Sequence, residues 1–174
     1  MKKILRLLVF IIVLVIVFTL WIFIKPNISR TCKIKELDIS LKIPYAYQET
    51  YNESENVLLN MYNSEGIRIS VVELKDNFWS SGDTEARMNE YLNVISAMNY
   101  DSEIKNIKKE ILKKKDGNLA KVELTLRNPS GNAKKVSVIA NEKIGNFVIE
   151  IEGSMSVMEN KAKEIEKIIK SIKT

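Results

Sequence analysis

A run of 18 residues without a charged side chain, from Leu7 to Ile24, constrains this chain more than any other feature. As a helix, the run would span about 27 Å, which is close to the thickness of the hydrocarbon core of a bilayer. Trp21 stands near its end, where an amphipathic ring suits the membrane interface. The run therefore predicts one transmembrane helix and a membrane anchor over residues 1–24, with the lipid bilayer as a partner of residues 7–24.

Three other kinds of N-terminal segment fit this run less well. A type IV pilin-like segment needs a glutamate early in the apolar run, and this run has none. A cleaved signal peptide has a shorter apolar region, followed by small residues at its cleavage site. A lipoprotein needs small residues just before its cysteine, whereas Cys32 follows Ser29, Arg30 and Thr31. These differences favour an uncleaved anchor.

The orientation of the anchor depends on the basic residues that flank it. Lys2, Lys3 and Arg6 are packed together before the run, and the basic residues after it are spread over a longer stretch. Because basic residues favour the cytoplasmic side, we expect the N-terminus inside and the following domain on the outer face of the cell membrane.

Charge is distributed unevenly along the chain. The first 35 residues contain seven basic and no acidic side chains. The whole chain has 27 basic and 22 acidic residues, which leaves 20 basic and 22 acidic residues for 36–174, a net charge of −2. A nucleic-acid-binding domain has positive charge on its own folded surface. The sequence therefore predicts no nucleic-acid partner.

The chain has no histidine and only one cysteine, which excludes several kinds of site. A Ser-His-Asp or Cys-His catalytic pair, a structural zinc site and an internal disulfide all need residues that are absent. The sequence also lacks a calcium-binding loop and a glycine-rich phosphate loop. We therefore predict no catalytic, metal-binding or cofactor-binding residues, and no cofactor.

Residues 25–35 are predicted to form a polar tether, and the domain to cover residues 36–174. Apolar residues then alternate from Leu37 to Ile43, which indicates a half-buried strand that ends at Pro44. A weak strand is expected within 45–55. Two further apolar runs, 56–62 and 67–74, are joined by a turn that contains a glycine and predict a hairpin.

The second half of the domain shows both helical and strand patterns. A helical spacing begins at Thr84 and predicts a helix over 84–98. Residues 101–115 fit either a helix or a strand. Alternating apolar residues then predict three strands, around 120–126, 136–140 and 147–151. A C-terminal helix is expected from Ser156, where Ser156 and Glu159 have the spacing of a capping box. The order predicts an α+β fold, in which two helices pack on an antiparallel sheet.

Three stretches of the domain resemble the PsbP-like family, which includes the DcrB-type envelope proteins. They are the opening strand from Asp38 to Tyr45, the strand 67–74 with the helix 84–98, and the last strand and helix up to Lys173. The resemblance implies a PsbP-like sheet with helices packed on it. It also implies an accessory or binding module of a larger assembly.

Two groups of residues are candidates for an interaction surface. Phe78 and Trp79 lie in a predicted loop, where aromatic residues serve either as a binding anchor or as a lid over the core. Six lysines lie within 105–115 and could meet anionic lipid or an acidic partner, or could simply be solvated: Lys105, Lys108, Lys109, Lys113, Lys114 and Lys115.

These patterns predict a single-pass, membrane-anchored and non-enzymatic binding or accessory module of a bacterial envelope complex. Other envelope proteins are its expected partners. A hydrolase or transferase that uses carboxylates is the first alternative, and a buried carboxylate pair with a raised pKa in a pocket would favour it. The second alternative is a cytoplasm-facing domain that recruits soluble proteins to the membrane.

Overall fold

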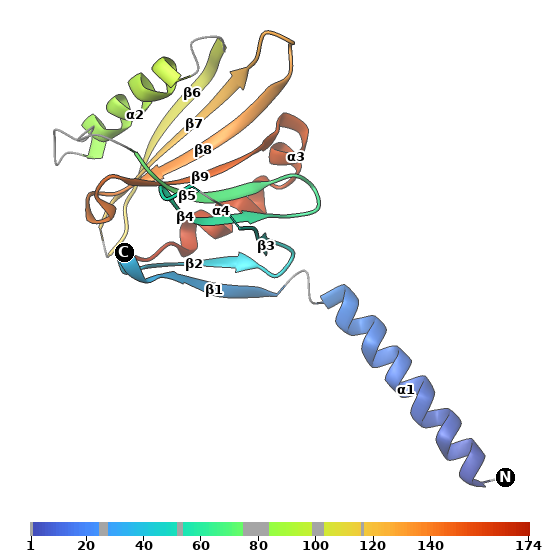
Figure 1. Ribbon diagram of the computed structural model, residues 1–174. Coiled ribbons are helices and arrows are strands. Elements are labelled where there is room, and N and C mark those ends of the chain that lie inside the picture. Colours follow the sequence, from blue (N-terminus) through green and yellow to red (C-terminus); the bar gives the residue numbers. More distant parts are fainter. Residues whose placement is uncertain (1, 25–27, 52–53, 75–83, 99–102, 116) are drawn as a thin grey trace.

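The computed structural model describes residues 2–24, 28–51, 54–74, 84–98, 103–115 and 117–174. An N-terminal helix precedes an α+β domain that is built on a strongly twisted sheet (Figure 1). The helices are α1 (Lys2–Ile24), α2 (Thr84–Met98), α3 (Met155–Asn160) and α4 (Ala162–Ser171). The strands are β1 (Ser29–Ile34), β2 (Ile39–Pro44), β3 (Gln48–Glu49), β4 (Val57–Tyr62), β5 (Arg68–Glu73), β6 (Glu103–Leu112), β7 (Leu119–Arg127), β8 (Ala133–Ala140) and β9 (Phe147–Ser154).

Helix α1 lies apart from the sheet in Figure 1, and the structure describes the side chains of its residues 6–21. Among the described residues, no helix is sufficiently long and apolar to cross a membrane. The anchor over residues 1–24 stays a prediction.

Seven strands form the main sheet, in the order β3-β4-β5-β9-β8-β7-β6, and every neighbouring pair is antiparallel. Strands β1 and β2 form a separate antiparallel pair. Helix α2 covers one face of the main sheet, while α3, α4 and the β1–β2 pair lie on the other face (Figure 1). The predicted α+β class with an antiparallel sheet and packed helices is confirmed.

Alternation along the strands produces two cores, one on each face of the sheet. In β7, Ala120, Val122, Leu124 and Leu126 face α2, where they pack with Tyr91 and its helical neighbours. On the opposite face, the buried side chains of β2, β4, β5 and β9 pack against α4. The strands predicted from alternation in these segments are therefore confirmed.

The segment predicted as a tether is only partly one, because residues 29–34 form strand β1. Its residues pair with β2 from Ser29 opposite Pro44 to Ile34 opposite Ile39. The inward positions of β1 are Arg30, Cys32 and Ile34, and the polar Arg30 interrupts the apolar alternation that would have indicated a strand.

The ambiguous segment 101–115 contains strand β6, which lies at the edge of the sheet. Asn106 has a φ of 55°, and the pairing with β7 shifts by one residue between Lys105 and Lys108. This bulge breaks the period of two, so that the apolar residues fall at a helix-like spacing. The helical alternative for this segment is therefore wrong.

The predicted capping box at the C-terminal helix is also wrong. Helix α3 begins at Met155, and its N-cap residue is Ser154, whose side chain makes no capping hydrogen bond. Ser156 therefore lies inside the first turn. The expected C-terminal helix itself is present, divided into α3 and α4, and Ile165, Ile168 and Ile169 form a buried apolar face on α4.

Candidate functional site

The predicted lysine surface lies on β6 and on the loop that follows it, and the structure distributes its members over different environments. Lys105 lies 2.9 Å from a carboxylate oxygen of Glu103 on the same strand. Lys109 donates a hydrogen bond to the side chain of Asn89 on α2, the helix that covers one face of the main sheet. Phe78 and Trp79, the other predicted candidates, lie outside the described residues.

Lys114 has a structural role that its position in a lysine run does not indicate. Its ammonium group donates to the carbonyl oxygens of Ile169, Lys170 and Ile172, at distances of 3.3, 2.9 and 2.6 Å. These carbonyls lie at the C-terminal end of α4, where helices leave acceptors unpaired and favour a positive charge. Lys114 therefore connects the β6–β7 loop to α4.

The part of the sheet next to β6 on the α4 side contains a mixed ion network. Lys121 lies 2.9 Å from Glu123 and 3.6 Å from Glu110, and Lys135 lies 3.6 Å from Glu123. Burial would raise the pKa of Glu123, but its contacts with Lys121 and Lys135 outweigh this effect and lower the pKa below its ordinary value. The charges on this part of the sheet largely balance one another.

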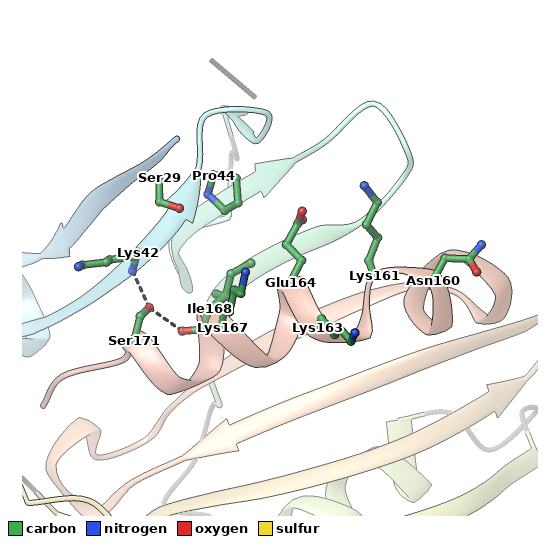
Figure 2. Close-up of a pocket in the computed structure, with 10 residues that line it drawn as sticks. All are labelled: Ser29, Lys42, Pro44, Asn160, Lys161, Lys163, Glu164, Lys167, Ile168 and Ser171. Carbon is green, nitrogen blue, oxygen red and sulfur yellow. Dashed lines mark hydrogen bonds between the residues drawn. The ribbon is translucent and has the colours of Figure 1, made fainter. Parts of the chain in front are cut away.

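A groove of about 490 Å³ lies between α4 and the β1–β2 pair (Figure 2). Strands β1 and β2 contribute one wall, and the exposed side of α4 contributes the other. The lining residues are Ser29, Lys42, Pro44, Asn160, Lys161, Lys163, Glu164, Lys167, Ile168 and Ser171. The lining contains four lysines and one carboxylate, so it is strongly basic.

Hydrogen bonds hold the two walls of the groove together at the C-terminal end of α4. The backbone N–H of Lys42 donates to the hydroxyl oxygen of Ser171 at 2.8 Å, and this hydroxyl donates to the carbonyl of Ile168 at 2.6 Å. Beyond the helix, the backbones of Ser40 and Lys173 exchange two further bonds, of 3.1 and 2.8 Å. The groove is thus formed by the packing of the domain itself.

The lysines of the groove differ in their partners. Lys161 lies 2.9 Å from Glu65, and Glu164 accepts a hydrogen bond of 2.9 Å from the hydroxyl of the buried Tyr47. Lys42, Lys163 and Lys167 are exposed, and none of them forms an ion pair within the described part of the chain. Positive charges therefore outnumber negative ones in the groove, and three of its lysines have no ion-pair partner among the described residues, which suits an anionic ligand.

No local pattern in the sequence indicates this groove, because its residues come from elements that are far apart in the chain. Lys42 lies on β2, and the other three lysines lie at the start of α4 or within it. The polar face of the C-terminal helix was visible in the sequence. Its pairing with the β1–β2 wall was not, since it depends on the tertiary fold.

One half-buried carboxyl group, that of Glu150, lies on the α2 face, away from the groove. Glu150 accepts a hydrogen bond of 3.0 Å from the hydroxyl of Tyr91 on α2. Burial raises the pKa of Glu150, and the bond from Tyr91 offsets this only in part. Its neighbour on the same face, Glu152, forms ion pairs with Arg68 and Lys134. The bond from Tyr91 connects α2 to the sheet, and the ion pairs of Glu152 connect β9 to β5 and β8.

No group of three histidine, cysteine, aspartate or glutamate side chains that could hold a metal ion lies among the described residues. Cys32, the single cysteine, is half-buried, and burial raises the pKa of its thiol despite the nearby positive charge of Arg30. A raised pKa lowers the reactivity of a thiol, because the thiolate is the nucleophile.

Comparison with known proteins identifies the fold. No model of a protein family matches the sequence, and no curated protein matches it either. A solved structure from Bacteroides thetaiotaomicron is 15% identical in sequence, with a TM-score of 0.31. The match covers 78% of this chain and 44% of the Bacteroides chain. At this score, the likeness carries no argument.

The solution structure of cyanobacterial PsbP from Synechocystis is much more similar in fold. It is 12% identical in sequence and has a TM-score of 0.59, and the match covers 83% of this chain and 91% of that chain. Identity this low carries no information about shared activity. The expected resemblance is confirmed for the fold: this chain has a PsbP-like fold.

Proposed function

We propose that this chain is a single-pass, membrane-anchored and non-enzymatic binding or accessory module of a bacterial envelope complex, with its domain on the outer face of the cell membrane. The observation that carries the proposal is the exposure of α1. Its large apolar side chains from Leu7 to Trp21 are each between 50% and 65% exposed, on every side of the helix. A helix that is apolar all round needs an apolar environment, and no part of the described domain covers it.

Two observations support a binding role rather than catalysis. The PsbP-like fold is the fold of a family whose members, as the resemblance implies, act mostly as accessory modules. Among the described residues that line the groove, one carboxylate is present, that of Glu164, and it is already hydrogen-bonded to Tyr47. A pair of acid and base groups is therefore not assembled there.

Membrane extraction tests the anchor. The full chain, expressed in a bacterium, is expected to stay in the membrane pellet after an alkaline carbonate wash. Leu14→Arg combined with Val15→Arg should release it, because each arginine at the centre of a membrane helix costs about 3 kcal/mol. The matched variant Leu14→Ala with Val15→Ala should stay in the pellet. Wild-type protein in the supernatant would contradict the anchor.

Labelling with a membrane-impermeant maleimide tests the topology. Because Cys32 is half-buried and its pKa is raised, we suggest Cys32→Ser combined with Ser130→Cys, which places a thiol in the exposed β7–β8 turn. Labelling in intact cells is the expected result. Labelling only after permeabilisation would favour the cytoplasm-facing alternative.

The hydrolase alternative is favoured by one observation, the raised pKa of Glu150 next to Glu152. Against it, Glu150 does not line the groove and is hydrogen-bonded to Tyr91. Glu150→Gln retains an acceptor for that bond. If the full chain hydrolyses a substrate from a panel of esters and glycosides, and Glu150→Gln abolishes the turnover, the non-enzymatic proposal is wrong.

A further inference from the structure

We propose that the groove between α4 and the β1–β2 pair binds the phosphate-bearing headgroups of anionic phospholipids in the membrane that anchors the chain. The inference rests on the proposed function, because it requires α1 to lie in a bilayer. It goes further by assigning the ligand of a particular surface. Its starting point is the positive charge of the groove, in a domain whose net charge over residues 36–174 is −2.

The distance from the anchor to the groove follows from the covalent chain. Ser29 lines the groove and is five residues after Ile24, the last residue of α1. Even a fully extended chain of this length spans only about 17 Å. The β1 end of the groove therefore lies within about 17 Å of the end of α1, whatever the orientation of the domain.

The lysines are arranged around the groove rather than at one point. In Figure 2, Lys42 lies on β2 at one end, and Lys161 lies with Asn160 at the other. A single bound phosphate would be held by donors that converge on one position. A row of separated ammonium groups matches a surface that presents many phosphates, such as the headgroup layer of an anionic bilayer.

The chemistry of the lining is also suited to lipid. Lys42, Lys163 and Lys167 have no carboxylate partner among the described residues, so no internal ion pair has to break when an anion binds. Pro44 and Ile168 add apolar surface between the charges. Two carboxylates oppose these charges among the described residues: Glu65, which is paired with Lys161, and Glu164, which accepts the hydrogen bond of Tyr47.

The predicted lysine run on β6 is a natural internal control. Strand β6 lies at the edge of the main sheet opposite to β3, and Lys108 on it is exposed, as are the groove lysines. Lys108 lies next to Glu110 and opposite Glu123 in the register. It should therefore respond much less to anionic lipid.

The experiment measures how fast each lysine is acetylated in the full chain, reconstituted into nanodiscs. One set of discs contains phosphatidylcholine only, and the other also contains phosphatidylglycerol. We expect acetylation of Lys42, Lys163 and Lys167 to slow in the anionic discs by about fivefold, the factor that corresponds to one lysine at an anionic surface. Acetylation of Lys108 should stay the same.

Variants identify the groove as the cause. In Lys163→Glu with Lys167→Glu, the protection of Lys42 should disappear. Both positions are exposed on α4, and glutamate is as good a helix former as lysine, so the domain should fold. The matched variant Lys105→Glu with Lys108→Glu, which adds the same negative charge to β6, should keep the protection of Lys42.

Each other outcome overturns the inference in a different way. Equal acetylation of the groove lysines in both kinds of disc, with the chain inserted, would refute lipid binding and leave the anchor intact. Protection by glycerol phosphate in neutral discs would assign the groove to a soluble phosphate. Protection that occurs in native membranes but not in anionic discs would assign it to an acidic protein. A chain that inserts into neither disc would refute the proposed function, and this inference with it.

Discussion

Two regions of this molecule are rich in lysine, and they differ in how the fold uses them. The β6 region, residues 103–115, contains six lysines that are close together in the sequence. The structure assigns Lys114 to backbone carbonyls of α4 and its C-cap, Lys109 to α2 and Lys105 to a neighbouring glutamate. The groove collects its four lysines from β2 and α4 and leaves three of them without an ion pair among the described residues. Density of charge along the chain is therefore a poor guide to density of charge on the surface.

The largest difference between the two regions should appear when an isoleucine of each is truncated. Ile34 in β1 is 5% exposed and packs in the core behind the groove wall, whereas Ile107 in β6 is 48% exposed. We expect Ile34→Ala to lower the free energy of unfolding by about 3 kcal/mol. Ile107→Ala should change it by less than about 0.5 kcal/mol. Urea unfolding of the full chain in detergent micelles measures both. A loss at Ile34 as small as the one expected at Ile107 would contradict the packing of β1 in the core.

Truncation of Lys114 should lower the free energy of unfolding more than truncation of its neighbours in the same lysine run. Lys114→Ala removes a charged donor from three carbonyls at the end of α4, and we expect a loss of about 2 kcal/mol in the free energy of unfolding. Lys113→Ala and Lys115→Ala remove exposed side chains and should have effects within about 0.5 kcal/mol. The same urea titration provides the measurement. Equal effects at all three positions would contradict the structural role of Lys114.

The sequence predicted most of the fold because most strands alternate cleanly and most helices have one apolar stripe. The run from Ala120 to Leu126 is an example, since each second residue faces α2. The failures have local causes. Strand β1 has Arg30 at an inward position, and β6 has a bulge at Asn106 that changes the period. Both strands lie at an edge, where burial no longer forces a strict pattern.

The groove could be predicted only in part. The lysines on the polar face of the C-terminal helix are visible in the sequence, and so is Lys42 at an outward position of its strand. Their common surface arises from tertiary contacts, such as the bond from the Lys42 backbone to Ser171 and the pairing of Ser40 with Lys173. No local pattern in the sequence encodes these contacts.

Tyr47 tests how firmly α4 is held against the β1–β2 side. Its hydroxyl donates to Glu164, and Tyr47→Phe should lower the free energy of unfolding by about 1 kcal/mol at neutral pH.

The stability of the fold should also depend on alkaline pH through Tyr47. Burial first, and then the charge of Glu164, raise the pKa of Tyr47. Because the unfolded chain ionises at the ordinary tyrosine pKa of about 10, stability should fall as the pH rises through that value. Tyr47→Phe should reduce this alkaline loss, and Tyr45→Phe, at an exposed position, should not. Unfolding titrations on either side of about pH 10 measure the difference, and an alkaline loss unchanged in Tyr47→Phe would contradict it.

The smallest effect concerns two ion pairs of equal length, one in each region. Lys161 and Glu65 lie 2.9 Å apart and connect α4 to the β4–β5 turn, whereas Lys105 and Glu103 lie 2.9 Å apart on one strand. Exposed pairs contribute little, and their coupling is usually below about 1 kcal/mol. The pair on β6 joins residues two positions apart, which remain close neighbours in the unfolded chain, so its coupling should be near zero. The pair at the groove joins distant segments only in the folded state and should give about 0.5 kcal/mol at low salt, less at high salt. Double-mutant cycles with alanine at both positions of each pair measure the two couplings. If the β6 pair were the stronger one, sequence proximity would outweigh tertiary placement, contrary to the difference between the two regions.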